Sequence, residues 1–260
     1  MNIQINNPIK CDILLSIFQH IKLFSSNILI VFEKEKMYIQ TMDPSHISII
    51  EINIPSNWFD KYENSQDKMM IGVNSLILFK ILNTRDKSQN IEIIYAENND
   101  EKLFVNFYSN DKTVFNKNFE VPLMSLDYDI MDIPDTEYQA EITMSSFNFA
   151  NLINDLKNFG DTMDIQCSDE KILLSAKSQD NGKMSVEINI DDLNSFIIDE
   201  GGKLELSFSL KQLYNMTQFH KISKEVELKM SNDYPIRIIQ NLGAENANLT
   251  FFLAPKISNE

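Results

Sequence analysis

Few residues in this sequence are of the types that perform catalysis or bind metal ions, and they lie far apart. The histidines and cysteines are His20, His46, His220, Cys11 and Cys167. Their spacing fits neither a metal site nor a disulfide framework, so both thiols are expected to be reduced and structural. His46, in the segment MDPSHIS, could act as a base, but no nucleophile motif accompanies it. The segment GGKLEL lacks the upstream glycine and the following Ser or Thr of a phosphate-binding loop. The sequence therefore predicts a protein that is not an enzyme and has no metal or cofactor, with a structural or docking role for His46.

The distribution of charge points instead to a polyanion as a partner. The formal net charge of −15 argues, taken alone, against a general nucleic-acid-binding protein, because phosphate contacts need Lys and Arg. Four segments with helical periodicity, 8–24, 73–87, 145–160 and 209–221, nevertheless have net charges of +1, +2, 0 and +2, which leaves −20 for the rest of the chain. These helices either have ordinary solvated faces or all face one polyanion. No base-reading motif is present, so in the second case the contact would be with backbone phosphate.

The four helical segments belong to an internal repeat. Apolar residues at 14, 17 and 21 of the first segment correspond to those at 149, 152 and 156 of the third by an offset of 135. The second and fourth segments correspond by 134, and the strand-like segments KMYIQ and NIEII recur at an offset of 135. Alternating or β-branched apolar segments between the helices predict strands. Because regular β–α alternation is absent, we predict an α+β fold: two similar domains, each with two helices on one face of an antiparallel sheet.

Polar residues and glycine indicate where these elements end. Ser or Asn near several helix starts is expected to accept hydrogen bonds from free N–H groups, and Gly160 lies where a helix C-terminal glycine belongs. Between the two copies, the segment VPLMSLDYDIMDIPDTEYQ mixes prolines and acidic residues with apolar ones. It is either a linker packed on the core or a connector that lines a groove. The predicted domains are 1–120 and 138–260, joined by residues 121–137.

The C-terminal stretch NLTFFLAPKISNE is unusually apolar for the end of a soluble chain. Phe251 and Leu253 are expected to alternate with Phe252 in a final strand with one face in the core, and Pro255 is expected to end that strand. The tail is predicted to form part of a docking surface. No signal segment and no apolar run long enough to cross a membrane is visible, so a soluble, intracellular protein without membrane contact is expected.

Several motifs resemble the proliferating cell nuclear antigen family, the eukaryotic-type DNA sliding clamps. MYIQTMDPSHISII resembles a signature of that family, and LMSLDYDIMDIPDTEY resembles its interdomain connector loop. GVNSLILFKIL, NFGD, SNDYP and LAPKI match further family motifs in order along the chain. The resemblance covers essentially the whole sequence. It implies a DNA-clamp fold that assembles into a homotrimeric ring of similar domains around duplex DNA, with the helices lining the hole and the acidic exterior repelling DNA.

The resemblance also implies partners and a docking pocket. The partners would be duplex DNA, bound independently of base sequence, DNA polymerase and other proteins with clamp-interacting peptides, and a clamp loader. The expected localisation is the nucleus, or a viral replication compartment. A peptide with hydrophobic and aromatic anchors would dock against Met42, Ile47, Ile49, Met131, Ile133, Pro235, Phe252, Ala254, Pro255 and Ile257, with His46 and Lys256 nearby. Subunits would pair an edge strand around 114–121 with one around 183–188 of the next copy.

The residues expected to face DNA depart in part from the family pattern. They are Lys10, His20, Lys22, Lys80, Arg85, Lys157, Lys211, His220 and Lys221. Asn151 and Asn154 stand at two family arginine positions, so the channel is expected to be less positive than is usual in the family, with a shallower salt dependence. This departure keeps an alternative open: a divergent clamp paralogue, either a subunit of a heterotrimeric checkpoint-type ring or a viral processivity factor that does not close as a homotrimer.

Overall fold

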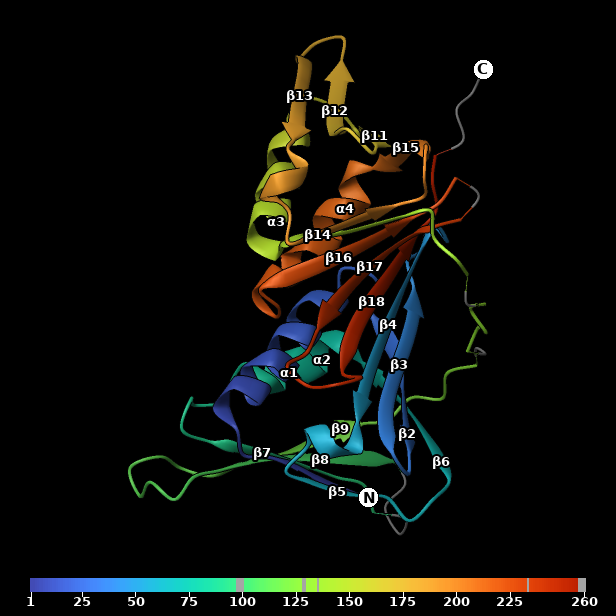
Figure 1. Cartoon of the computed structure of the whole chain (residues 1–260). Coiled ribbons are helices and arrows are strands. Elements are labelled where there is room, and N and C mark those ends of the chain that lie inside the picture. The colour runs from blue at the N-terminus through green and yellow to red at the C-terminus, as the bar shows by residue number, and fades with distance from the viewer. Residues whose placement is uncertain (97–100, 128–129, 135, 233, 257–260) are drawn as a thin grey trace. The chain divides into compact units, whose positions relative to one another are not determined.

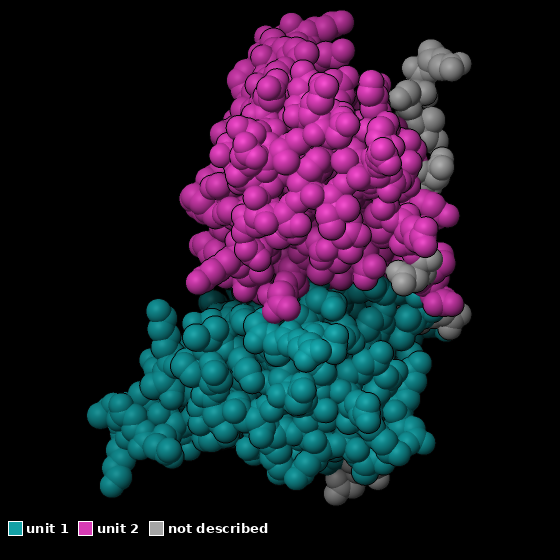
Figure 2. All heavy atoms as spheres, in the orientation of Figure 1, with its two compact units in different colours: residues 1–44, 50–131, 242–249 teal, residues 45–49, 132–241, 250–260 magenta. Residues whose placement is uncertain are grey.

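The computed structural model describes residues 1–96, 101–127, 130–134, 136–232 and 234–256. The chain divides into two compact units (Figure 2). Unit 1 comprises Met1–Pro44, Ile50–Met131 and Leu242–Leu249, and unit 2 comprises Ser45–Ile49, Asp132–Asn241 and Thr250–Glu260. None of the described helices is long and apolar enough to cross a membrane.

Unit 1 is built from two antiparallel sheets and two α-helices (Figure 1). Its elements are β1 (Asn2–Ile5), α1 (Pro8–Ile21), β2 (Asn27–Glu33), β3 (Lys36–Met42), β4 (Ser48–Pro55, of which the first two residues belong to unit 2), η1 (Ser56–Trp58), β5 (Lys61–Glu63), β6 (Lys68–Asn74), α2 (Ser75–Leu82), β7 (Asn90–Ile94), β8 (Lys102–Tyr108) and β9 (Lys117–Pro122). One sheet has the strand order β5-β1-β7-β8-β9, and the other has the order β4-β3-β2-β6.

Unit 2 repeats this arrangement. Its elements are β10 (Ala140–Ser145), α3 (Ser146–Leu156), β11 (Thr162–Ser168), β12 (Ile172–Ser178), β13 (Gly182–Ile188), η3 (Ile190–Asp192), β14 (Ser195–Ile198), β15 (Lys203–Ser209), α4 (Leu210–Thr217), η4 (Gln218–Lys221), β16 (Glu225–Met230), β17 (Ile236–Asn241) and β18 (Asn248–Leu253, of which the first two residues belong to unit 1). Its strands have the orders β14-β10-β16-β17-β18 and β13-β12-β11-β15. These orders repeat those of unit 1, with β10 in the place of β1 and β13 in the place of β4. The predicted α+β fold of two similar domains is confirmed.

Each helical segment predicted from the repeat contains one of the four α-helices of the described chain. Asn7 Oδ1 accepts from the N–H of Ile9 at 2.9 Å before α1, and Asn74 Oδ1 accepts from the N–H of Ile77 at 3.0 Å before α2. These side chains satisfy N–H groups that have no partner within the helix. Ser209, before α4, makes no such side-chain bond. Capping therefore fixes the start of three helices, since Ser145 acts in the same way before α3.

Gly160 has a different role from the one its position predicted. α3 ends at Leu156, and Gly160 is absent from the glycines with positive φ. A Cβ at this position would instead lie 2.6 Å from the carbonyl oxygen of Lys177. Glycine is required here because the backbone of the next hairpin approaches closely, and not because a helix ends in the left-handed conformation.

The helices pack in pairs, α1 with α2 and α3 with α4 (Figure 1). The apolar stripe of α1 is buried, as its periodicity predicted: Leu14, Ile17 and Ile21 are at most 1% exposed. In unit 1, Trp58 is fully buried and its indole Nε1 donates to the carbonyl of Leu242 at 2.9 Å. The outward faces of the helices mix polar and apolar side chains: α2 exposes Leu76 and Ile77 beside Lys80, and α3 exposes Phe147 beside its asparagines.

Candidate docking and DNA-facing surfaces

The residues after β18 run as an extended segment within unit 2. The N–H of Ala254 donates to the carbonyl of Ile47 at 2.9 Å, and the N–H of Lys256 donates to the carbonyl of Ser207 at 2.7 Å. The Lys256 ammonium also donates to Thr162 Oγ1 at 2.5 Å. These bonds hold the chain on both sides of Pro255, which has no N–H to donate. Ile257, which the sequence also places at the docking site, lies outside the described residues.

β18 is buried on both faces, so the expected alternation of a buried and an outward-facing side is wrong. Phe251 and Leu253 have no exposed surface, and Phe252 is only 8% exposed. The guanidinium carbon of Arg237 lies 5.6 Å from the centre of the Phe252 ring. The side of β18 that carries Phe252 is therefore covered in part by Arg237. As a result, Phe252 offers only a small part of its ring to a partner.

The loop before β4 turns in a conformation that is uncommon for residues with a side chain. His46 has a φ of 57°, in the left-handed region. His46 is exposed and Ile47 is 38% exposed, whereas Ser48 is 1% exposed. An exposed isoleucine bonded through its carbonyl to Ala254 gives unit 2 a small apolar surface. Of the other predicted docking residues in unit 2, Ile49 and Ile133 are half-buried, Pro255 is half-buried, and Pro235 is exposed.

Two predicted docking residues belong to unit 1. Met42 is the last residue of β3 and is half-buried, and Met131 is 37% exposed. Both backbone polar groups of Met131 are hydrogen-bonded to the side chain of Gln40. Sequence reasoning missed Gln40, because its partner lies 91 positions away and no motif links the two.

The predicted DNA-facing residues of unit 1 differ in how available they are. Lys80 is exposed, and Lys22 is half-buried with its Nζ 4.0 Å from the centre of the Phe79 ring. Lys10 donates to the carbonyl of Trp58 at 2.5 Å. The side chain of Arg85 is only 2% exposed; it donates to three carbonyls of the loop after α2 and forms an ion pair with the Asp12 carboxylate. In this structure the guanidinium of Arg85 is thus bound to its own unit. His20, near the end of α1, is half-buried.

In unit 2 the basic residues lie on α3, α4 and the turns that follow them. Lys211 and Lys221 are exposed. The Nζ of Lys157 lies 3.4 Å from the centre of the Tyr214 ring, and His220 Nδ1 lies 2.9 Å from the carbonyl oxygen of Thr217. The exposed face of α3 adds neutral amides rather than charges: Asn148, Asn151 and Asn154. This surface offers a few cations among many uncharged hydrogen-bonding groups.

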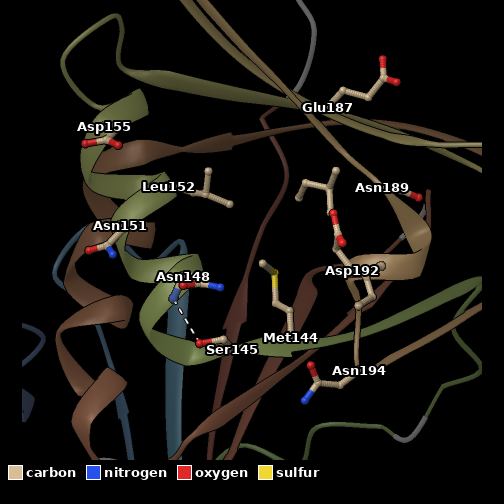
Figure 3. A pocket seen from close by; sticks show the side chains of 12 residues that line it. Met144, Ser145, Asn148, Asn151, Leu152, Asp155, Glu187, Asn189, Asp192 and Asn194 are labelled. Atoms are coloured by element: carbon tan, nitrogen blue, oxygen red, sulfur yellow. Dashed lines mark hydrogen bonds between the residues drawn. The ribbon is translucent and has the colours of Figure 1, made fainter.

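Unit 2 also has a pocket that the sequence did not predict (Figure 3). Its volume is about 410 Å³, and it lies between α3 and the segment that runs from the end of β13 through η3. It is lined by Met144, Ser145, Asn148, Asn151, Leu152, Asp155, Glu187, Ile188, Asn189, Asp192, Leu193 and Asn194. Three of these side chains are carboxylates and none is basic, so the pocket repels phosphate. Among the described residues, no group of three or more His, Cys, Asp or Glu is placed to hold a metal ion.

The two thiols are buried in the cores of their units. Burial raises the pKa of both Cys11 and Cys167 to about 11. At neutral pH both are therefore protonated, and a protonated, buried thiol is a poor nucleophile. This agrees with the structural role that the sequence predicts for them.

The duplicated α+β fold, with one pair of helices in each unit, is the architecture expected of a DNA sliding clamp. The model of the proliferating cell nuclear antigen N-terminal domain matches residues 9–131, and the model of its C-terminal domain matches residues 132–257. The chain therefore belongs to the proliferating cell nuclear antigen family. Clamps of this family are non-enzymatic scaffold proteins of DNA replication that bind DNA and replication proteins.

Proposed function

We propose that this protein is a homotrimeric sliding clamp that encircles duplex DNA and tethers DNA polymerase and other replication and repair proteins. The observation that carries the proposal is a pair of open sheet edges. Among the described strands, β9 is the last strand of its sheet in unit 1, and β13 is the last strand of its sheet in unit 2. An open edge leaves a row of backbone N–H and carbonyl groups ready to pair with another chain.

The side chains of the two edges support pairing between copies. β9 has Lys117 near its start and Glu120 near its end, and β13 has Lys183 near its start and Glu187 near its end. Antiparallel pairing brings each basic end beside an acidic end. Phe115, just before β9, is 84% exposed, more than any other large apolar side chain of the described residues. A phenylalanine this exposed at a sheet edge favours a contact with another chain.

The repeat offers a precedent for this pairing within one chain. By strand order, β18 corresponds to β9 and β4 corresponds to β13. In unit 2, Ala254, which follows β18, donates its N–H to the carbonyl of Ile47, which precedes β4. A backbone contact between β9 of one copy and β13 of the next would be the equivalent bond between subunits of the ring.

The proposed contact with DNA is electrostatic and independent of base sequence. The cations that support it are the exposed Lys80, Lys211 and Lys221, together with the half-buried Lys22. Lysine side chains of this kind bind backbone phosphate and carry no base information. The neutral amides on α3 can hydrogen-bond to phosphate oxygens without releasing counterions, so affinity should depend weakly on salt.

The proposed docking of partner peptides uses the apolar side chains of the tail, the loop before β4 and the connector. Two of the predicted apolar docking residues are well exposed, Ile47 of unit 2 at 38% and Met131 of unit 1 at 37%. A partner peptide with aliphatic and aromatic anchors would cover them, and such anchors are often worth about 2 kcal/mol or more each on truncation.

Two measurements test this function together. Multi-angle light scattering at micromolar concentration should give the mass of three chains, and the protein should stimulate a DNA polymerase on primed circular template. A monomer in the first measurement would contradict self-closure and favour the alternative of a heterotrimeric or viral factor, which the low helix charge motivates. Nuclear residence is a further part of the proposal, and fluorescence microscopy of a tagged chain would test it.

A further inference from the structure

The connector between the domains is fixed to unit 1 at two separate points. Near its start, the N–H of Met124 donates to the carbonyl of Gly72 at 2.9 Å, and the two residues form an isolated antiparallel bridge. Further along, Met131 bonds to Gln40. Gly72 lies in β6 and Gln40 in β3, two strands of the same sheet of unit 1.

The first attachment depends on the absence of a side chain at position 72. A Cβ there would overlap the carbonyl oxygen of Met124 and would lie 2.9 Å from Leu126 Cγ. Because β6 is the edge strand of its sheet in unit 1, the connector adds one backbone bond to an edge that is otherwise open. This attachment fixes the backbone at Met124 but does not hold Met131, which lies seven residues later in the chain.

The second attachment is made by one primary amide. Gln40 Oε1 accepts from the backbone N–H of Met131 at 2.7 Å, and Gln40 Nε2 donates to the backbone carbonyl of Met131 at 2.9 Å. A side-chain amide that pairs with both polar groups of one residue acts as a neighbouring strand would. Gln40 is 5% exposed, so water competes little for these bonds.

The orientation of the amide is set by two neighbours. Gln40 Nε2 also lies 3.0 Å from Glu51 Oε1 and 3.1 Å from the hydroxyl of Tyr38, and that hydroxyl donates to Glu51. A carboxylate accepts and cannot donate, so it requires the amide nitrogen, and not the oxygen, on its side. The oxygen is then left to face the N–H of Met131. Burial and the neighbouring carboxylate raise the pKa of Tyr38, so its hydroxyl stays protonated.

We propose that Gln40 is a positioning residue for peptide docking, because it clamps the connector so that Met131 is presented to the partner. This inference rests on the proposed function. Gln40 makes no apolar surface of its own, and Met42, two residues later, is another predicted docking residue. The clamp removes backbone freedom that the peptide would otherwise have to remove on binding, and such preorganisation raises affinity.

The test uses a near-isosteric substitution in the full-length chain. In Gln40→Glu, a carboxylate oxygen replaces the amide nitrogen and faces both the Met131 carbonyl and Glu51. In Gln40→Met, the size is kept and both bonds are lost without added charge, so the clamp can be tested even where the charged variant folds poorly. Gln179→Glu, an exposed position in the turn between β12 and β13, is the matched charge control.

Two readouts separate positioning from general stability. Native-state hydrogen exchange at the Met131 amide should become roughly 10- to 100-fold faster in Gln40→Met, since both hydrogen bonds are lost. In Gln40→Glu one carboxylate oxygen can still accept from the Met131 N–H, but the other repels the Met131 carbonyl and Glu51, so exchange should become faster by a smaller factor. Affinity for a synthetic peptide with one aliphatic and two aromatic anchors should fall about tenfold, as expected when only a tenth of molecules hold the connector in place. The melting temperature of Gln40→Met and the mass of the assembly should change little, and Gln179→Glu should resemble the native chain.

The outcomes are distinguishable. Unchanged exchange at Met131 would show that Gln40 does not hold the connector in place. Faster exchange with unchanged peptide affinity would show that the contact between Gln40 and Met131 does not serve docking. Either result overturns the inference about Gln40 and leaves the proposed function as a sliding clamp intact. A native chain that does not bind the peptide would instead refute the docking part of the proposed function, and with it the role of Gln40 in docking.

Discussion

Replacement of Phe115 by Ala should weaken the ring without unfolding the subunit. The side chain is 84% exposed in the single chain, so it contributes little to the stability of unit 1. Full burial of a phenylalanine stabilises by about 1.5–3 kcal/mol, and an interface that covers most of Phe115 would lose about 2 kcal/mol on truncation. That is a factor of about 30 in the equilibrium constant of each interface.

The ring multiplies this effect, because three identical contacts close it. In a monomer–trimer equilibrium the midpoint concentration varies as the inverse square root of the association constant. Three contacts weakened by about 2 kcal/mol each therefore raise the midpoint on the order of 100-fold. Mass photometry over a dilution series measures that midpoint.

Phe147→Ala is the matched control for this prediction, since Phe147 is also exposed, at 60%, but lies at the start of α3 and not at a sheet edge. Its midpoint should equal that of the native protein. An unchanged midpoint for Phe115→Ala, or an equal shift in both variants, would refute the assignment of β9 to the subunit contact.

Three further predictions concern DNA, docking and pH. Lys22→Ala combined with Lys80→Ala should weaken DNA binding and lower the salt slope by roughly one for each lysine that contacts phosphate; fluorescence anisotropy at several salt concentrations measures this, and a fall in peptide affinity would contradict separate surfaces. Ile47→Ala should weaken peptide binding at nearly unchanged melting temperature, whereas Phe252→Ala should cost about 3–5 kcal/mol of stability because its ring is buried; calorimetry showing equal stability for the two would refute that difference. The free energy of unfolding should fall as pH rises from about 9 to about 11, because burial raises the thiol pKa from 9.0 to about 11 and only the unfolded thiols ionise in that window. Urea titrations at several pH values measure this fall, and a Cys11→Ala variant with the same pH dependence of stability as the native chain would contradict this cause.

Local patterns in the sequence were sufficient for the fold. The four helices lie where 3.6-residue periodicity put them, since the apolar stripe of an amphipathic helix can be recognised within a few turns. The duplication could be recognised because two copies of one fold keep apolar residues at equivalent positions, and both units have the same strand order. Family motifs extended this to the class of protein, which the two matched domains confirm.

Individual side chains in the candidate sites were less predictable. Arg85 and Lys80 look alike as basic residues of one helical segment, yet Arg85 is almost completely buried by carbonyls of its own loop and Lys80 is exposed. Phe252 fits a half-buried strand by alternation, but Arg237 covers its outer side. For Arg85 the deciding contacts come from the backbone of the loop after α2, and for Phe252 the contact comes from a side chain of the earlier strand β17. The periodicity of the element itself encodes neither contact.

The sequence by itself determined the duplicated α+β fold, the helix positions and the family, because each depends on short-range periodicity or on motifs that stay in order along the chain. Only the tertiary structure decided how the connector is held, because Gln40 and Gly72 reach Met131 and Met124 across long stretches of chain. Hydrogen bonds between residues so far apart leave no local pattern, and a side-chain amide can replace a strand only once the fold has brought the two backbones together.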